Sequence, residues 1–161
     1  MAPMAGITNL PFRLTVRALG AGLVCTEMVS SMGLILNQEK TLGYLRSDKA
    51  EKPLSVQIFG SESKVMAKAA QAAVEKGADI IDINMGCPVK KVTKTGAGAA
   101  LMRNLKRAEE IISAVRLAVS VPLTVKIRIG WSANEAVACE MARIIEGCGA
   151  DALAIHARYA V

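Results

Sequence analysis

The chain has 161 residues, a length that fits one domain, and 52% of them are hydrophobic whereas only 3% are aromatic. Its apolar residues come in runs shorter than the ~20 residues of a membrane span, and no basic segment precedes an apolar core, so we expect neither a membrane span nor a secretory signal. The net charge of +6 favours a polyanionic partner such as nucleic acid, but a solvated basic surface explains it equally well.

Short apolar runs alternate with helical patterns along the whole chain. Residues 2–5 predict the remnant of a first strand, and later runs predict strands at 23–26, 54–59, 80–84, 123–129 and 152–156. The helices predicted between them cover 9–19, 61–76, 105–119 and 133–146, and their predicted caps include Asn9, Ser61 and Asn104. This repeated order of strand and helix predicts parallel strands.

Polar residues fall at or near the carboxyl ends of four predicted strands: Gln57, Asn84, Lys126 and His156. In a β/α barrel these ends converge on one mouth, where active sites lie, whereas an open doubly wound sheet would not turn them all toward one ligand. We therefore predict a TIM (β/α)8 barrel. Only six of its eight strands are found, so residues 1–161 are expected to form an incomplete barrel of about six βα units that lacks strands seven and eight.

The four cysteines form no C-x-x-C pair, and His156 is the only histidine, so we expect no metal site. No disulfide pattern is visible either. Both features predict a protein of the reducing cytoplasm.

The segment 80–91 is the most informative stretch of the chain. A buried strand ends in Asn84, continues through a glycine to Cys87 and a proline, and reaches Lys90 and Lys91. It thus delivers an amide, a thiol and a basic loop to one rim of the predicted barrel. The glycine-containing stretch 93–99 that follows is flexible enough to lie close to a ligand.

The pattern Asp82-Ile83-Asn84-Met85-Gly86-Cys87-Pro88, with Gly98-Ala99 downstream, is similar to the signature of the tRNA-dihydrouridine synthases. The resemblance extends over the whole chain, through Ala2-Pro3-Met4-Ala5-Gly6-Ile7-Thr8-Asn9, Ser55-Val56-Gln57-Ile58, Thr124-Val125-Lys126-Ile127-Arg128 and Ala154-Ile155-His156-Ala157-Arg158. Members of that family are FMN-dependent barrels that reduce the C5–C6 bond of selected tRNA uridines and use NADPH to reload the flavin. They also have a helical carboxyl-terminal domain that grips tRNA, which is absent from residues 1–161.

The resemblance implies a role for each matching position. Cys87 would donate a proton to the substrate. The FMN contacts would be Pro3, Met4 and Ala5, which line the flavin ring, together with Gln57, Lys126 and His156.

The residue types suit these roles on chemical grounds. Reduction of an uncharged double bond needs a hydride at one carbon and a proton at the other, and a cysteine thiol ordinarily holds its proton at neutral pH. A lysine at a strand end can stabilise the negative charge of a reduced flavin. Lys126 could instead pair with a carboxylate or form a Schiff base, as in barrel aldolases. Glu27 could orient Lys126.

The remaining candidates concern the RNA. Asn84 could read the uracil edge, or it could cap the loop backbone. Lys90 and Lys91 are expected to bind RNA phosphates, and Arg128 and Arg158 are candidates for phosphate or ring contacts, with surface salt bridges as the alternative. A uridine inside folded tRNA must be flipped out to enter a barrel mouth, at a cost of a few kcal/mol.

Two other kinds of function fit the same residues. The chain could belong to another barrel enzyme, either an FMN oxidoreductase of a small substrate or a lyase that uses Lys126. It could also be a non-catalytic RNA-binding protein that keeps the basic mouth without a cofactor.

Overall fold

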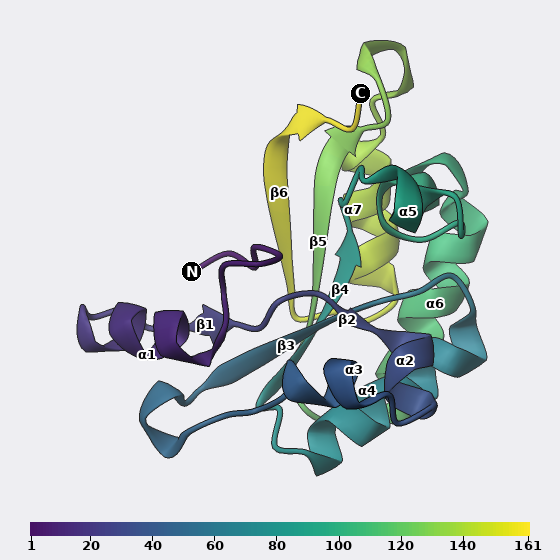
Figure 1. The fold of residues 1–161 in the computed structure, drawn as a ribbon. Coiled ribbons are helices and arrows are strands. Elements are labelled where there is room, and N and C mark those ends of the chain that lie inside the picture. Colours follow the sequence, from purple (N-terminus) through teal and green to yellow (C-terminus); the bar gives the residue numbers. More distant parts are fainter.

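A single curled sheet organises the computed structural model, which describes all 161 residues (Figure 1). All strand pairs are parallel, the order is β1-β3-β4-β5-β6, and β2 also pairs with β3. The strands are β1 Val24–Cys25, β2 Val29–Ser30, β3 Leu54–Phe59, β4 Ile80–Met85, β5 Leu123–Gly130 and β6 Ala152–Tyr159. The strands are parallel, as their alternation with helices predicted, and the sheet forms part of a barrel, as the polar residues at the strand ends predicted.

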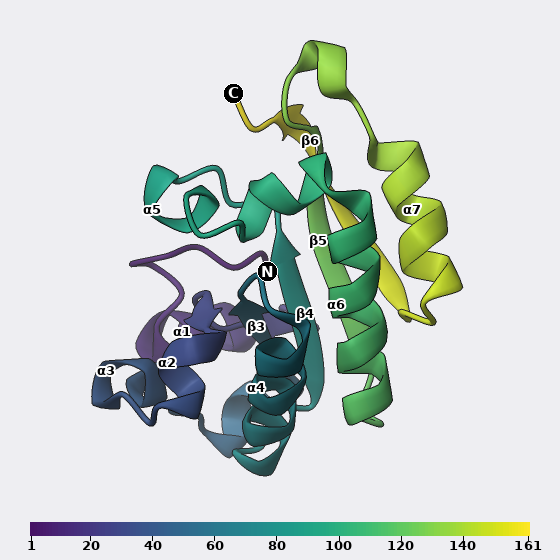
Figure 2. The ribbon, with the colours of Figure 1, turned by 90° about the vertical axis from the view of Figure 1, so that its right-hand side faces the viewer.

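Three long helices cover the outer face of this sheet: α4 Ser63–Glu75, α6 Leu105–Ala118 and α7 Ala138–Gly147 (Figure 2). Helix α1, Leu10–Ala18, projects beside β1 at the opposite edge of the sheet from β6 (Figure 1). The shorter elements are α2 Ser31–Ile35, α3 Glu39–Gly43, α5 Lys90–Thr93 and the 3-10 turns Lys49–Glu51, Gly98–Arg103 and Ala133–Glu135. None of the helices is both long and apolar enough to cross a membrane.

Side chains alternate between the two faces of each central strand. The outward-facing ones join helix residues in one core, which contains Val56, Ile58, Ile81, Ile83, Val125, Ile127, Ala69, Ala73, Ile111 and Val115. The inward-facing ones are largely polar, and strand register makes neighbours of Gln57 and Asp82, Asn84 and Lys126, and Arg128 and His156. The curl of the sheet therefore gathers polar groups on its concave side.

The prediction of a strand at residues 2–5 is wrong. Residues 1–4 have no regular structure, and a turn follows in which the carbonyl of Met4 accepts hydrogen bonds from the N–H groups of Ile7 and Thr8. Pro3 has no N–H to donate to a ladder. The sheet still has six strands, because the segment after Leu23 contributes two short ones, β1 and β2.

Two of the three predicted caps are confirmed. The side chain of Asn9 accepts a hydrogen bond from the Phe12 N–H at the start of α1, and that of Asn104 accepts one from the Arg107 N–H at the start of α6. The third is wrong, because Glu62, not Ser61, is the residue before α4 and makes no capping bond.

The predicted helix at 133–146 starts five residues too early. Residues 133–135 form a separate 3-10 turn, and α7 begins at Ala138. Between them the chain pairs with the end of β5, where Ala136 forms an antiparallel bridge to Gly130 and the Val137 N–H donates to the carbonyl of Ile129 over 2.9 Å. Backbone groups that are hydrogen-bonded to a strand cannot also form the hydrogen bonds of a helix.

A buried ion pair fastens α1 to the rest of the protein. The Arg13 guanidinium is 2% exposed and contacts the Glu51 carboxylate, 0% exposed, at 2.6 Å. Arg13 also donates to the carbonyl of Thr8 at 2.9 Å and to that of Arg46 at 2.7 Å. Since the Thr8 hydroxyl is hydrogen-bonded to the backbone of Met4, this arginine also holds the amino-terminal segment in place.

Candidate active site

A cavity of about 270 Å³ lies at the carboxyl ends of β3, β4, β5 and β6. Eight of the twelve predicted site residues line it: Pro3, Ala5, Gln57, Asn84, Cys87, Lys126, Arg128 and His156. Three further residues, which were not predicted as site residues, complete the lining: Met28, Gly86 and Pro88. Strand ends and the loop after β4 therefore surround one space.

A chain of hydrogen bonds crosses the floor of this cavity from strand to strand. The Gln57 Nε2 donates to the Asp82 Oδ2 at 2.5 Å. The Asn84 Nδ2 donates to the Gln57 Oε1 at 2.8 Å. The Asn84 Oδ1 in turn accepts from the backbone N–H groups of Gly86, at 3.2 Å, and Cys87, at 2.9 Å. The Asp82 carboxylate at one end of this chain thus fixes the orientation of the Gln57 and Asn84 side-chain amides.

This arrangement leaves mainly hydrogen-bond donors free. The Asn84 oxygen is used twice, so its amide has one spare N–H, while the Gln57 amide has one spare N–H and one spare lone pair. The half-buried Lys126 ammonium makes no hydrogen bond or ion pair with the protein. The floor therefore suits a ligand edge rich in acceptors, such as the carbonyl groups of a pyrimidine or a flavin.

Burial shifts the two charged groups of the floor in opposite directions. It raises the pKa of Asp82, against the hydrogen bonds from Thr124 and Gln57. It lowers the pKa of Lys126, while the negative charge of Asp82 acts to raise it. The two groups therefore favour each other's charged form.

At the open edge of the sheet, His156 tends toward its neutral form. Its side chain is exposed, yet partial desolvation lowers its pKa, and the nearby cations Arg128 and Lys126 lower it further. A neutral imidazole can donate one hydrogen bond and accept another.

The loop that carries Cys87 is held from three sides. Asn84 binds its N–H, and the Ala99 N–H donates to its carbonyl at 3.0 Å. Gly98 has a φ of +61°, and a Cβ there would lie 2.6 Å from the Cys87 oxygen, so only glycine fits. The stretch expected to be flexible thus folds back onto the thiol loop, and Cys87 remains half-buried at the cavity wall.

Arg128 joins this loop to the last strand. Its Nε donates to the carbonyl of Gly86 at 2.8 Å, and its Nη1 donates to the carbonyl of Tyr159 at 2.7 Å. It forms no ion pair, so the alternative of a surface salt bridge is wrong for Arg128. The guanidinium instead positions the backbone on two sides of the cavity.

The amino-terminal segment closes the cavity from the side of β1. The terminal amino group donates to the carbonyl of Leu23 at 2.7 Å, and the Gly6 N–H donates to the Glu27 carboxylate. These bonds hold Pro3 and Ala5 at the cavity wall. The expectation that Glu27 orients Lys126 is wrong, because its carboxylate binds the Gly6 backbone instead.

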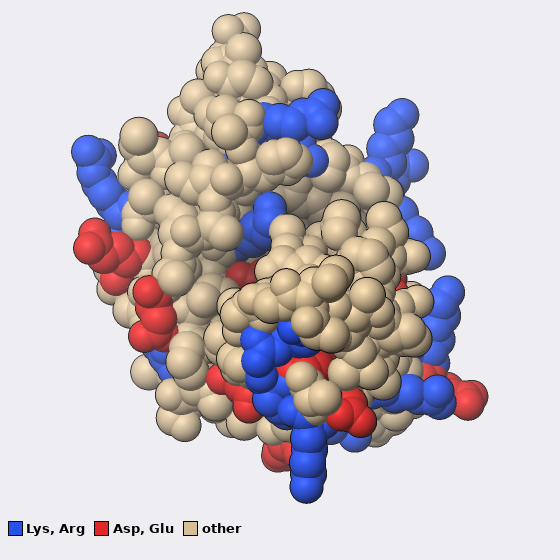
Figure 3. All heavy atoms as spheres, turned by 90° about the vertical axis from the view of Figure 1, so that its left-hand side faces the viewer, with Lys and Arg blue, Asp and Glu red and all other residues tan.

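Four predicted site residues lie outside this cavity. Met4 is 39% exposed, Lys90 and Lys91 are exposed on α5, and Arg158 lines a separate pocket together with Pro88 and Tyr159. On the side of the molecule away from α6, Figure 3 shows basic atoms both within the central hollow and above it. The cations Lys90, Lys91 and Arg158 therefore do not line the candidate active site itself.

Asp82 and Thr124 are parts of the site that the sequence analysis missed as functional residues. Asp82 occupies the strand position two residues before Asn84, so period-2 alternation puts both on the same face. A carboxylate inside an otherwise apolar strand was the signal that could have revealed it. No group of three or more His, Cys, Asp or Glu side chains is placed to hold a metal ion.

A parallel β/α half-barrel with a thiol loop and a polar floor at its strand ends places the chain among the β/α-barrel proteins, whose functional sites lie at this end of the strands. The family model described as dihydrouridine synthase (Dus) matches residues 1–161. The chain is 48% identical over 158 residues to tRNA-dihydrouridine synthase B of Pseudomonas aeruginosa, 49% identical over 158 residues to that of Proteus vulgaris, and 46% identical over 159 residues to a probable tRNA-dihydrouridine synthase of Rhodobacter capsulatus. In each case 98% of this chain is covered, together with 48% or 49% of the relative.

The chain therefore belongs to the dihydrouridine synthase family. It spans about half the length of the curated relatives it matches.

Replacing Asp82 with asparagine tests the charge beneath the site. The pKa of Asp82 is raised in the folded protein above the ~3.9 of an aspartate in the unfolded chain, so the folded protein binds the carboxyl proton more tightly. The wild-type protein should therefore lose stability as the pH rises from about 4 through the raised pKa. Asp82→Asn should flatten that part of the curve, with a change in unfolding free energy within ~1 kcal/mol at pH 4. Urea unfolding between pH 4 and 8 measures both proteins. A variant that loses more stability at pH 7 than at pH 4 would show that the ionised carboxylate stabilises the fold.

Proposed function

We propose that the protein reduces uridine to 5,6-dihydrouridine in tRNA, using FMN and NADPH, and that Cys87 is its general acid. Membership of the dihydrouridine synthase family and the gathering of Gln57, Cys87, Lys126 and His156 around one cavity support this. The single observation that carries the proposal is the thiol beside a floor of free N–H donors. A tRNA substrate also implies that the protein works in the cytoplasm.

The residues present fit a flavin. The acceptor-rich pyrimidine edge of an isoalloxazine ring matches the spare N–H of Gln57 and the unpaired Lys126. Pro3, Ala5 and the exposed Met4 would contact the ring from the amino-terminal side, and His156 from β6. A cavity of about 270 Å³ has room for a ring system but not for a whole cofactor with its phosphate. When bound, FMN would supply the hydride that one carbon of the uracil double bond receives.

The chain's own residues would handle the proton and the negative charge. The Cys87 thiol, held at the cavity wall by Asn84 and Ala99, would give its proton to the other carbon. Lys126, whose charged form Asp82 favours against the effect of burial, would stabilise the negative charge that the cofactor carries. The spare N–H of Asn84 would bind a carbonyl of the uracil.

Basic groups around the mouth would bind the RNA backbone. Lys90 and Lys91 on α5, and Arg158 on β6, are exposed and make no ion pair within the protein. Arg128 would contribute its charge from the cavity wall. Such contacts offset the cost of flipping the uridine out of its stack, which is a few kcal/mol.

Residues 1–161 would form the amino-terminal part of a barrel that other segments of a longer protein complete. The match to about half of each relative supports this, and so does β6, which is exposed on both faces at one edge of the sheet. Strands seven and eight and a helical tRNA-binding domain would follow.

The experiment is reduction of tRNA by the full-length protein. Unmodified tRNA, FMN and NADPH are incubated with the protein, and dihydrouridine is measured by mass spectrometry together with NADPH oxidation. The expected result is dihydrouridine at one or a few tRNA positions, formed in proportion to the NADPH consumed. A flavin-loaded protein that oxidises NADPH but leaves every uridine unchanged would contradict the proposal.

A further inference from the structure

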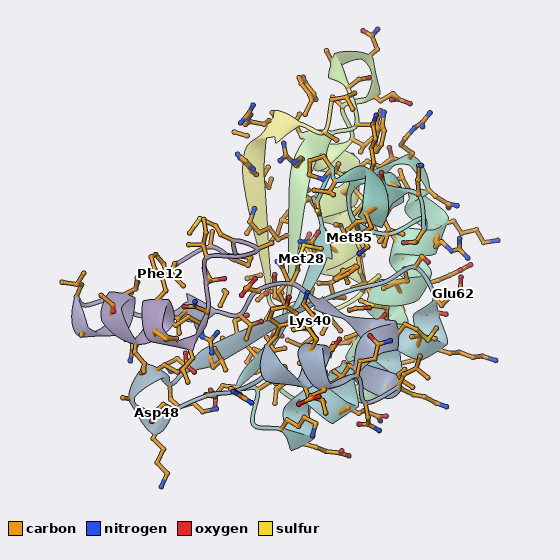
Figure 4. All side chains as sticks on the ribbon, viewed as in Figure 1. Phe12, Met28, Lys40, Asp48, Glu62 and Met85 are labelled. Atoms are coloured by element: carbon orange, nitrogen blue, oxygen red, sulfur yellow. The ribbon has the colours of Figure 1, made fainter.

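A second, larger cavity adjoins the candidate active site. Its volume is about 680 Å³, and it lies among α2, α3, α5 and the carboxyl ends of β2 and β3. Ala5 and Met28 line both cavities, so a ligand chain that leaves the first enters the second directly. Figure 4 shows Met28 near Lys40, which lines the second cavity from α3.

Flat apolar surfaces line this second cavity. The chain contains only two tyrosines, two phenylalanines and one tryptophan, yet Tyr44 and Phe59 are both found here. Each is half-buried, so part of its ring is open to the cavity. Aromatic rings of this kind stack with nucleic acid bases.

Cations lie at the entrance of the cavity. Lys40 on α3 and Lys91 on α5 are exposed, and neither makes an ion pair or a side-chain hydrogen bond in the protein. The carboxylate of Glu62 nearby is already paired with Arg107 at 2.9 Å. Two free ammonium groups that line one cavity suit a phosphate of the ligand.

The polar wall offers an acceptor as well. The Glu27 carboxylate accepts the Gly6 N–H and has further lone pairs toward the cavity, which it also lines. A purely apolar ligand would leave this carboxylate and the lysines unused, and a free phosphate would not use the rings. A base with N–H groups, joined to a phosphate, uses all three.

We propose that the second cavity binds the nucleotide next in the RNA strand to the uridine that is bound beside Cys87 at the mouth of the first cavity. This inference rests on the proposed function. The shared wall at Ala5 and Met28 places the two cavities one after the other, as successive nucleotides of a strand require. The enzyme would thus read an extruded dinucleotide rather than a single base.

The test uses the full-length, flavin-loaded protein with unmodified tRNA. Tyr44→Leu keeps apolar volume but removes the ring and should raise the KM for tRNA about tenfold, the effect of one lost base–aromatic stack. Lys40→Ala should lower the salt dependence of tRNA binding by about one phosphate contact. Lys68→Ala removes an exposed lysine of α4 that lines neither cavity and should change nothing.

Flavin reduction by NADPH without tRNA separates the possible ligands. Its rate and its KM for NADPH should be unchanged in both cavity variants. A raised KM for NADPH would assign the cavity to the reductant and overturn the proposal, as would a KM for tRNA within twofold of wild type in both variants. Because Lys40 is exposed, its variant keeps the test valid if Tyr44→Leu fails to fold. A wild-type protein that forms no dihydrouridine overturns the proposed function together with this inference.

Discussion

Replacing Cys87 with alanine is expected to lower the rate of uridine reduction by a factor of about 10² to 10⁴, the usual contribution of a positioned general acid. The flavin should still bind, because the thiol is not among the groups that form the polar floor. The measurement is single-turnover formation of dihydrouridine by the full-length protein, with the yellow flavin spectrum recorded in parallel.

The position of the Cys87 thiol is the reason for this expected loss of activity. Cys87 lies at the cavity wall on a backbone fixed by Asn84, Ala99 and Gly98, so alanine removes the proton donor and leaves the loop unchanged. Cys139→Ala is the matched control, since that thiol is exposed on α7 and lines no part of the cavity. Full turnover by Cys87→Ala would remove this residue from the proposed mechanism.

Replacing Glu51 with alanine is expected to destabilise the protein by about 3–5 kcal/mol, because it leaves the Arg13 guanidinium buried without its counter-charge. Urea unfolding of the protein measures the effect. Activity should fall as well, since Arg13 binds the carbonyl of Thr8 and Thr8 holds Met4 beside the cavity.

Glu62→Ala provides the comparison for this pair. The Glu62 carboxylate contacts Arg107 at 2.9 Å, but the two side chains are 62% and 42% exposed. Glu62→Ala should therefore lower the free energy of unfolding by less than ~1 kcal/mol. The double variant Arg13→Met, Glu51→Leu replaces the ion pair with apolar groups and should recover part of the stability. Equal losses for Glu51→Ala and Glu62→Ala would show that burial does not strengthen the Arg13–Glu51 contact.

The strands that carry the site were predictable because their apolar runs, visible in the sequence, are also the segments that are buried in the folded sheet. Runs such as 54–59 and 80–84 are apolar enough to be recognised alone, and Asn9 and Asn104 cap helices through contacts within three residues. Parallel pairing then brings Gln57 and Lys126 to the same rim, although they are far apart in sequence.

Other features depend on distant partners and could not be predicted. Residues 2–5 look like a strand, but Pro3 and the turn at Met4 leave no ladder to join. Residues 136–137 look helical until β5 takes up their backbone groups. In both places hydrogen bonds to other segments take part, from the terminal amino group to the carbonyl of Leu23 and from the Val137 N–H to the carbonyl of Ile129.

The sequence by itself determined the βα order, the family signature and the residue types at the strand ends, since these follow from local periodicity and side-chain chemistry. The tertiary structure alone decided that Asp82 orients Gln57 and Asn84 and that a second cavity adjoins the first. Hydrogen-bond direction and cavity shape arise only when register and curl bring separate strands together, so no local pattern encodes them.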